Sequence, residues 1–336
     1  MSPTRKLQAR SVQYSRFGGV DVLEIVDVPT PKAGPGEVVV EVMAAGINHI
    51  EAYVRQGKYL DGEVHVEFPQ TQGSDFAGIV REVGEGVTSF ARGAEVLGHA
   101  AMSSHATVIV VPAGNLVAKP PALSWELAGS LFLAGLAAEE AVKTVHISEG
   151  ETLVTSAAAG GVGSIVAQLA MLRGATVIGT CGERNFDYLR QINVKPVVYG
   201  PGLADRIRQV APKGVSAYID NFGKDDRVVA DELGVAPGRF WSSAQRRAVE
   251  LKAIRPTPDD SVEQTRTLVK LAGLAADRSL DILISGFYPF EKVQDAFDDL
   301  EKRHARGKIV LGMRPVDNSF HGITRGKMRD AQERQA

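Results

Sequence analysis

Six small residues in the middle of the chain, Ala158-Ala159-Gly160-Gly161-Val162-Gly163, could hold a diphosphate group. They follow a short apolar run, Leu153–Thr155, that is typical of a buried parallel strand, and they precede an Ala- and Leu-rich segment that is typical of a helix. Small residues let the backbone come close to phosphate oxygens, and a helix N-terminus offers free N–H groups and partial positive charge. The stretch therefore predicts a dinucleotide-binding turn, with contacts from Ala158, Gly160, Gly161, Val162 and Gly163.

The usual pattern of such turns is Gly-x-Gly-x-x-Gly, and Ala158 stands here in place of the first glycine. Ala is the smallest substitute, so the tight turn can survive. A second apolar run at residues 175–180 begins where a β-α-β unit would place its next strand. An ordinary glycine turn that binds no ligand is the alternative.

The elements that must position this turn form an alternating series. Residues 120 to 255 read as strands separated by helices, which is the pattern of a doubly wound parallel sheet. The predicted strands of this region are 151–155, 175–180, 196–199, 216–220, 238–242 and 250–254.

The regions on either side differ from this series. Residues 10 to 120 carry many short strand signals, at 38–44, 76–80, 95–97 and 106–111, which favour a compact barrel-like β domain. Ser124 reads as the N-cap of a helix. Later residues predict helices over 261–276 and 290–303 and a last strand over 307–311. The polar tail beyond Pro315 is either a loosely ordered extension or a terminal helix.

Composition excludes several classes of function. The 336 residues are 44% hydrophobic, and 38 basic against 40 acidic residues give a net charge of −2. This balance argues against nucleic acid or an anionic membrane surface as a partner. No apolar run is long enough to span a bilayer, and no secretory signal is visible, so a cytoplasmic location is expected.

Cysteine usage agrees with a reducing compartment. Cys181 is the single cysteine, so neither an intrachain disulfide nor a Cys-based structural zinc site can form within one chain. Cys181 itself reads as a small buried residue at the end of the second strand, rather than as a nucleophile.

Several motifs together carry a family resemblance. They are residues 45–59 (AGINHIEAYVRQGKY), 73–78 (GSDFAG), 83–84 (VG), the Ala-rich turn and 307–311 (GKIVL). In this order the chain, up to about residue 314, resembles the zinc-free quinone oxidoreductases of the medium-chain dehydrogenase/reductase superfamily, with ζ-crystallin as a relative. The resemblance implies an α/β fold, in which a doubly wound Rossmann domain is inserted into a GroES-like β-rich catalytic domain. The implied boundaries are 1–125 for the first part of the catalytic domain, 126–258 for the Rossmann domain, 259–314 for the return and 315–336 for the tail.

The resemblance also addresses metal binding. Zinc-dependent relatives have a cysteine ligand where this chain has Asn48, and a histidine ligand where it has Ser74. The chain is therefore expected to hold no metal, and His49 reads as a packing or hydrogen-bonding residue. Without a Lewis acid, hydride addition to a quinone or an α,β-unsaturated carbonyl compound is favoured, since these acceptors spread the incoming charge onto their own oxygen.

Residues around the second strand indicate the cofactor. Thr180 ends this strand at the expected contact edge; Glu183 comes late for an acidic residue that binds ribose, and Arg184, which follows at once, can pair with a 2′-phosphate. Tyr199 matches a tyrosine that relatives place near that phosphate. NADPH is therefore favoured over NADH, with Glu183 as the argument for NADH and a solvated surface charge as the other interpretation of Arg184.

Other positions are implied by the resemblance alone. Asn48, Tyr53 and Tyr59 match residues that line the nicotinamide and substrate pocket, where Tyr53 either donates to the substrate oxygen or only walls the cleft. Arg255 matches an arginine that follows the sixth strand in a bacterial relative and approaches the cofactor; a surface charge is the alternative. Ala137 replaces a threonine that relatives often use to hold the nicotinamide amide. Trp241 either shapes the substrate pocket or fills the core.

These interpretations combine into one functional hypothesis. The chain is expected to be a cytoplasmic, zinc-independent, NADPH-dependent oxidoreductase that reduces a quinone or an enone, with Tyr53 and Asn48 as catalytic residues. The alternative is an NADPH-binding protein with little or no catalytic activity, in a crystallin-like or regulatory role. The resemblance implies a homodimer, while Asn48 and Ser74 disfavour a zinc alcohol dehydrogenase.

Overall fold

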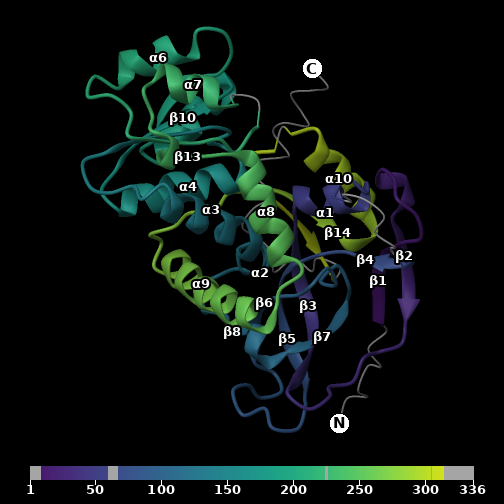
Figure 1. The fold of residues 1–336 in the computed structure, drawn as a ribbon. Helices are drawn as coiled ribbons and strands as arrows, with labels where there is room; N and C mark the ends of the chain where they lie inside the picture. Colours follow the sequence, from purple (N-terminus) through teal and green to yellow (C-terminus); the bar gives the residue numbers. More distant parts are fainter. Residues whose placement is uncertain (1–8, 60–66, 224–225, 304, 314–336) are drawn as a thin grey trace. The chain divides into compact units, whose positions relative to one another are not determined.

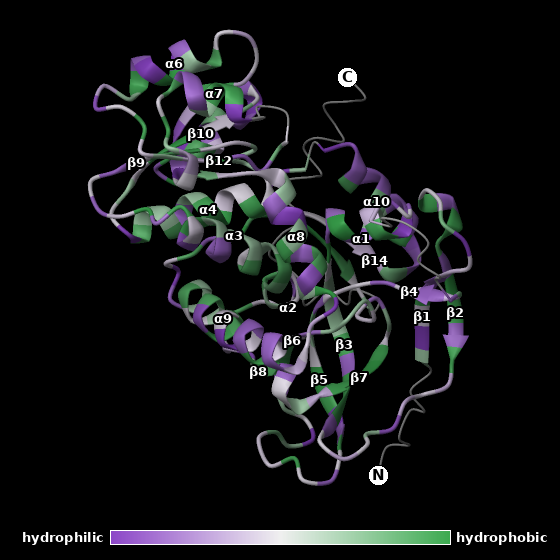
Figure 2. Ribbon diagram, in the orientation of Figure 1, coloured by the Kyte–Doolittle hydropathy of each residue, from purple (hydrophilic) through white to green (hydrophobic). Residues whose placement is uncertain are grey.

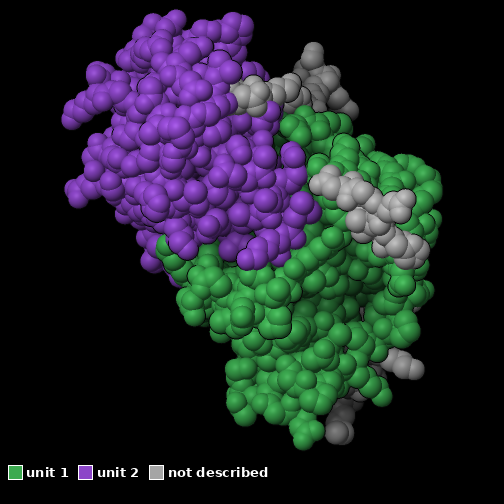
Figure 3. Space-filling model, in the orientation of Figure 1, with its two compact units in different colours: residues 1–133, 253–272, 284–336 green, residues 134–252, 273–283 purple. Residues whose placement is uncertain are grey.

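The chain folds into two compact units. The computed structural model describes residues 9–59, 67–223, 226–303 and 305–313. Unit 1 comprises residues 1–133, 253–272 and 284–336, and unit 2 comprises residues 134–252 and 273–283 (Figure 3). The domain boundaries expected from the sequence, at 125 and 258, stay predictions, and the predicted tail at 315–336 lies outside the described residues.

Unit 1 is built mainly from antiparallel strands (Figure 1). Its elements are β1 (Ala9–Tyr14), η1 (Val20–Val22), β2 (Glu24–Val28), β3 (Glu37–Ile47), α1 (His49–Arg55), β4 (Gln70–Thr71), β5 (Asp75–Val83), β6 (Glu95–His99), β7 (Val108–Pro112), η2 (Ala113–Asn115), β8 (Leu116–Ala118), α2 (Trp125–Ala128), β14 (Ile284–Pro289), η5 (Phe290–Lys292), α10 (Val293–Glu301) and β15 (Lys308–Gly312). A seven-stranded sheet runs in the order β14-β15-β3-β5-β6-β8, with β7 also paired to β3, and a smaller sheet joins β2, β1 and β4.

Strand β3 is the centre of the larger sheet. It is nearly continuous in apolar residues, as expected of a strand covered on both faces, and Figure 2 shows the same apolar character along β5 and β7. Its first half pairs with β7 and its last residues pair with β15, where Ile47 lies opposite Ile309. Strand β15 returns from near the end of the chain, and this pairing brings Lys308 beside the start of α1.

Helix α10 supplies much of the remaining core of unit 1. Its buried residues, Val293, Ala296, Phe297 and Leu300, recur at helical spacing on one face. They pack with the strand residues Val40, Ala45 and Leu311. The helix predicted over 290–303 is therefore confirmed, with a 3-10 turn as its first part.

Unit 2 holds a parallel sheet in the order β11-β10-β9-β12-β13. Its elements are β9 (Thr152–Thr155), α4 (Gly161–Leu172), β10 (Thr176–Cys181), η3 (Glu183–Asn185), α5 (Phe186–Gln191), β11 (Lys195–Val198), α6 (Leu203–Val210), β12 (Ala217–Ile219), α7 (Asp226–Glu232), η4 (Pro237–Arg239), β13 (Phe240–Trp241) and α8 (Ser243–Ala253). Two further helices, α3 (Phe132–Thr144) and α9 (Pro258–Ala276), each divide their residues between the units. This strand order is doubly wound, so the predicted fold class is confirmed.

One predicted strand of unit 2 is wrong. Residues 250–254 were expected to form the sixth strand, but residues up to Ala253 belong to helix α8. Helix-forming residues fill α8, including Ala244, Gln245, Arg246 and Leu251, and they outweigh the short apolar run that suggested a strand. Among the described residues, the sheet ends instead at β13, which is two residues long.

Candidate active site

The small-residue turn of unit 2 has the geometry of a phosphate cradle. The chain leaves β9, passes through Ala157 at a φ of +48°, and enters α4 with Gly160 as the N-cap. The Ala158 N–H donates to the carbonyl oxygen of Thr180, 3.1 Å away, and so ties the turn to the end of β10. The first-turn N–H groups of α4 lack acceptors within the helix and can serve an anion.

Gly163 is required by close packing in this turn. A methyl group at Gly163 would lie 2.3 Å from the carbonyl oxygen of Ala157, which is far inside van der Waals contact. The third glycine of the pattern is thus used where helix and turn approach most closely, as in dinucleotide-binding units. The residues present therefore fit a dinucleotide diphosphate.

The end of β10 carries the residues expected at the adenosine phosphate. Thr180 is buried there, and Arg184 is exposed in the 3-10 turn η3 that follows. Tyr199 is 57% exposed, and its ring stacks at 6.5 Å on Phe222. A methyl group at Gly182 would lie 3.9 Å from the Tyr199 ring. The structure thus brings Tyr199 next to the turn that carries Arg184.

Sequence reasoning missed Asp220, which follows β12. Its Oδ1 accepts the Ser156 hydroxyl at 2.6 Å and the N–H groups of Phe222 and Gly223 at 3.0 and 2.9 Å. These bonds hold the loop after β12 against the start of the cradle. The available signal was an acidic residue directly after a predicted strand, at the edge where such sheets bind ligands.

In unit 1, Asn48 precedes α1 and is engaged on both sides of its amide. Its Oδ1 accepts from the Lys308 ammonium, and its Nδ2 donates to Oε1 of Glu51 at 3.3 Å. The Asn48 backbone N–H donates to Oε2 of Glu51 at 2.9 Å, so the Glu51 carboxylate also caps the helix start. Asn48 is 7% exposed and Glu51 is fully buried.

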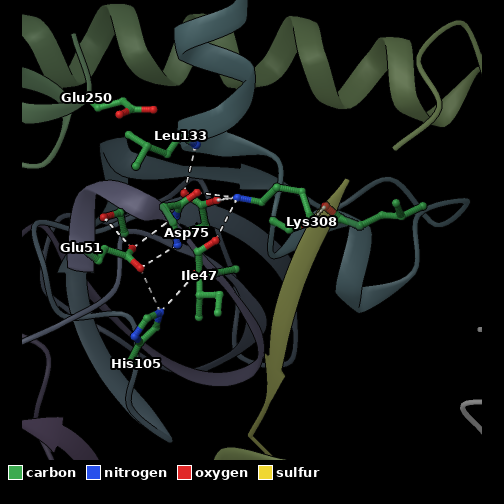
Figure 4. Close-up of polar contacts among 12 residues, drawn as sticks. Ile47, Glu51, Asp75, His105, Leu133, Glu250 and Lys308 are labelled. Carbon is green, nitrogen blue, oxygen red and sulfur yellow. Dashed lines mark hydrogen bonds and ion pairs between the residues drawn. The ribbon is translucent and has the colours of Figure 1, made fainter. Parts of the chain in front are cut away.

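Asp75 completes this buried network (Figure 4). Its Oδ1 accepts the Leu133 N–H at 3.0 Å, and its Oδ2 lies 3.6 Å from the Lys308 ammonium. Ser74, where zinc-dependent relatives have a histidine, donates its hydroxyl to Glu51 Oε1 at 3.2 Å. We call Asn48, Glu51, Ser74, Asp75, His105 and Lys308 the buried network.

Burial governs the protonation of this network. It raises the pKa of Glu51 to about 7 and that of Asp75 to about 6, and it lowers the pKa of His105 to about 4. The nearby Lys308 ammonium opposes the first two shifts. His105 is therefore neutral. Its Nε2–H donates a hydrogen bond to the Gly46 carbonyl oxygen, 3.1 Å away. Below about pH 7 Glu51 therefore keeps a proton, and Asp75 is the carboxyl group that lies beside the Lys308 ammonium.

Three aromatic or basic positions expected at the pocket lie in unit 1. Tyr53 is partly buried on α1. Arg255 lies over the Tyr59 ring, with 4.4 Å between its guanidinium carbon and the ring centroid. Arg255 follows helix α8 rather than a sixth strand. Its local structure therefore differs from that expected for the matching arginine, which follows a strand.

Two positions of unit 2 are packed inside. Trp241 is 3% exposed, which agrees with the alternative in which the indole fills the core. Ala137 is fully buried in α3.

The described residues contain neither a metal-binding cluster nor a membrane-spanning helix. No group of three or more His, Cys, Asp or Glu side chains in this part of the chain is placed to hold a metal ion. None of the helices in the described ranges is both long and apolar enough to cross a membrane.

Two family models match the chain. Residues 34–145 match the alcohol dehydrogenase GroES-like domain, and residues 192–311 match the zinc-binding dehydrogenase model. Among curated relatives, quinone oxidoreductase 1 of Escherichia coli K12 is 29% identical and is covered over 99% of its length by 90% of this chain. A chloroplastic quinone-oxidoreductase homolog of Spinacia oleracea is 28% identical, with 97% of its length covered by 90% of this chain.

Solved structures agree in fold and sequence. The quinone oxidoreductase of Coxiella burnetii superposes with a TM-score of 0.76 at 26% identity, covering 92% of this chain and all of that one. A mycobacterial protein solved in complex with NADPH gives a TM-score of 0.74 at 28% identity, covering 90% of this chain and 99% of that one.

Proposed function

Because the chain belongs to the medium-chain dehydrogenase/reductase superfamily and has quinone oxidoreductases among its relatives, we propose that it is a zinc-independent reductase that uses NADPH to reduce a quinone or an α,β-unsaturated carbonyl compound by hydride transfer. The observation that carries this proposal is that one chain contains both a small-residue turn suited to a dinucleotide, in unit 2, and a network around Asn48, in unit 1. By the family resemblance, Asn48 stands where zinc-dependent relatives have a cysteine ligand.

The choice of NADPH rests on the end of β10. Arg184 supplies a guanidinium that suits a 2′-phosphate, and Tyr199 presents an exposed ring beside the same turn. Glu183, the residue that would favour a ribose hydroxyl, shares this turn. A neighbouring structure is an NADPH complex, which supports the same choice.

The choice of substrate class rests on the chemistry of Asn48 and Ser74, the two positions that match zinc ligands of zinc-dependent relatives. An amide at Asn48 and a hydroxyl at Ser74 donate and accept hydrogen bonds, but they do not make a zinc site. A quinone or enone needs only hydrogen-bond donors at its oxygen as negative charge develops there. Asn48 and the Tyr53 hydroxyl are the donors that we assign to this oxygen, and Tyr53 or solvent supplies the proton.

The test is NADPH oxidation, followed by absorbance, with a panel of quinones and enones and with NADH in parallel. We expect NADPH-selective turnover of one acceptor class. A Tyr53→Phe, Asn48→Ala double variant should lower kcat by about 100-fold, because two donors to the developing oxyanion are lost. Full turnover by this variant on the best acceptor would overturn the assignment of the two residues.

A second candidate is an NADPH-binding protein with little or no catalytic activity. Ala137 favours it, since relatives often carry a threonine hydroxyl here for the nicotinamide amide. Saturable NADPH binding without turnover across the panel would support this candidate over the reductase.

The proposal also covers location, oligomeric state and partners. We assign the protein to the cytoplasm and to a homodimer that acts on a small molecule, without nucleic acid or membrane as partner. The net charge of −2 supports the last point. Light scattering after size-exclusion chromatography tests the dimer, for which a mass near 72 kDa is expected from a 35.9 kDa chain (2 × 35.9).

A further inference from the structure

A lysine from the last strand of unit 1 contacts the proposed substrate-binding amide. The Lys308 ammonium lies within hydrogen-bond distance of Asn48 Oδ1, and 3.3 Å from the carbonyl oxygen of Ile47. We propose that Lys308 is a positioning residue for the reduction, which fixes the Asn48 amide so that it acts on the substrate oxygen only as a donor. This inference rests on the proposed function of Asn48.

The amide orientation follows from the donor on one side of it and the acceptor on the other. An ammonium has hydrogens only to donate, so it must face Oδ1, whereas Glu51 Oε1 lies 3.3 Å from Nδ2 and accepts from it. The alternative rotamer would bring the amide NH₂ against the ammonium and Oδ1 against the carboxylate. One Nδ2 hydrogen is used by Glu51, and the Asn48 side chain also interacts with Asp75. We assign the second Nδ2 hydrogen to the substrate oxygen.

The lysine can act this way because its own position is fixed. Its side chain is 5% exposed, and β15 pairs with β3 so that Ile309 lies opposite Ile47. Asp75 Oδ2 stands 3.6 Å from the ammonium, and Asp75 is in turn held by the Leu133 N–H. Figure 4 shows Lys308 reaching from its strand toward Asp75 and Ile47. Each partner belongs to unit 1.

The ammonium also changes the strength of the donor. A positive charge at the amide oxygen draws electrons from nitrogen and makes the remaining N–H a stronger donor, as in other chains of hydrogen bonds in a dry interior. Since the oxyanion develops only as hydride arrives, this gain is larger in the transition state than with bound substrate. Loss of Lys308 should therefore lower kcat while leaving KM for NADPH nearly unchanged.

A double-mutant cycle separates this role from a structural one. The variants are Lys308→Met, Asn48→Ala and their combination, measured on the best acceptor. We expect Lys308→Met to lower kcat about tenfold in the wild-type background and less than twofold in the Asn48→Ala background. An equal loss in both backgrounds, or no loss in the first, would overturn the proposal.

Two further variants test whether the loss of activity arises from misfolding. Lys119→Met is the matched control, because Lys119 also has a side chain 5% exposed and an acidic partner, Glu95 at 3.0 Å, and it should keep kcat within twofold. Lys308→Met combined with Asp75→Asn removes both charges of the buried pair. In this double variant we expect thermal stability to recover while kcat stays low; recovery of kcat with stability would contradict a positioning role.

One readout does not depend on turnover. The side-chain amide resonance of Asn48 in ¹H–¹⁵N spectra is identified by its loss in Asn48→Ala, and it should move in Lys308→Met but not in Lys119→Met. An unmoved resonance would overturn the inference whether or not the protein reduces quinones. If instead the resonance moves but wild-type protein turns over no acceptor, the lysine–amide contact stands and the proposed function fails.

Discussion

The cofactor cradle of unit 2 and the buried network of unit 1 are built on opposite principles. The cradle is made of backbone and small residues, and it depends on the lack of a side chain at Gly163, where a methyl group would lie 2.3 Å from the Ala157 carbonyl oxygen. The network is made of buried polar and ionisable side chains from α1, β5, β15 and the segments next to these elements. The cradle should therefore be sensitive to added volume, and the buried network to a change of charge.

Added volume in the cradle should have the largest effect. Gly163→Val places branched carbon against the Ala157 carbonyl, so the turn must open, and we expect NADPH binding to weaken by about 4 kcal/mol, or roughly 1,000-fold. Titration calorimetry measures it. Gly238→Val is the control, because nothing lies within 4 Å of a methyl group there. Unchanged affinity in Gly163→Val would show that the cradle is not the binding site.

Removing a charge from the network should come next, with a dependence on pH. Glu51 keeps its proton to about pH 7 when folded but releases it near 4.5 when unfolded, so its pKa is raised by folding and stability is lost as pH rises through that window. Glu51→Gln does not lose stability in this way, because a glutamine side chain does not ionise. Its free energy of unfolding, relative to wild type, should rise by about 3 kcal/mol between pH 4.5 and 8.

Urea unfolding at both pH values measures the difference between Glu51→Gln and wild type. A constant offset between the two proteins at all pH values would mean that the Glu51 carboxyl is ionised normally, and the charge sensitivity of the network would then be lost.

One charged side chain, that of Arg184, lies close to the cradle and is expected to matter for its charge. Arg184→Ala removes the guanidinium that we assign to the 2′-phosphate, and NADPH affinity should fall by about 2 kcal/mol, or roughly 30-fold, with NADH affinity unchanged. Arg190→Ala, in the same unit, is the matched control; Arg190 pairs with Asp187 on the surface. Equal losses for both cofactors would assign Arg184 to folding rather than to selectivity.

The smallest effect is expected where Tyr59 and Arg255 meet. Tyr59→Leu removes the ring under the guanidinium and should cost about 0.5–1 kcal/mol of stability, whereas Tyr59→Phe keeps the ring and should cost less. Thermal unfolding compares the two. If Phe and Leu have the same effect, the ring does not hold Arg255 in solution.

The strand, small-residue turn and helix of the cradle were predicted well from the sequence because their signal is local. Small residues, the preceding strand and the following helix lie within some twenty residues, and each needs only its neighbours. The fold class was likewise visible in the alternation of strands and helices. The end of the sheet was not visible in the sequence, because residues 250–254 combine an apolar run with strong helix formers. The residues before them decide between strand and helix, since they form the rest of α8.

The buried network was only partly predictable for the opposite reason. Asn48 was identified by its place in a motif, whereas Glu51, Asp75 and Lys308 lie in the same set of motifs but were assigned no role. Lys308 is 260 residues from Asn48 and reaches it only through the pairing of β15 with β3. No spacing rule connects such residues, and only the register of two distant strands brings them together. Asp220 was missed likewise, since its partner Ser156 is 64 residues away.

The burial of Cys181 should protect the protein from alkylation by electrophilic substrates. Quinones and enones are electrophiles that alkylate thiolates, so an enzyme that handles them risks covalent damage at exposed cysteines. The only cysteine of the chain is 4% exposed, and burial raises the pKa of its thiol to about 11. At neutral pH it is therefore both protonated and shielded. Intact-mass analysis after exposure to excess quinone should show no thiol adduct on the folded protein and one on the unfolded chain.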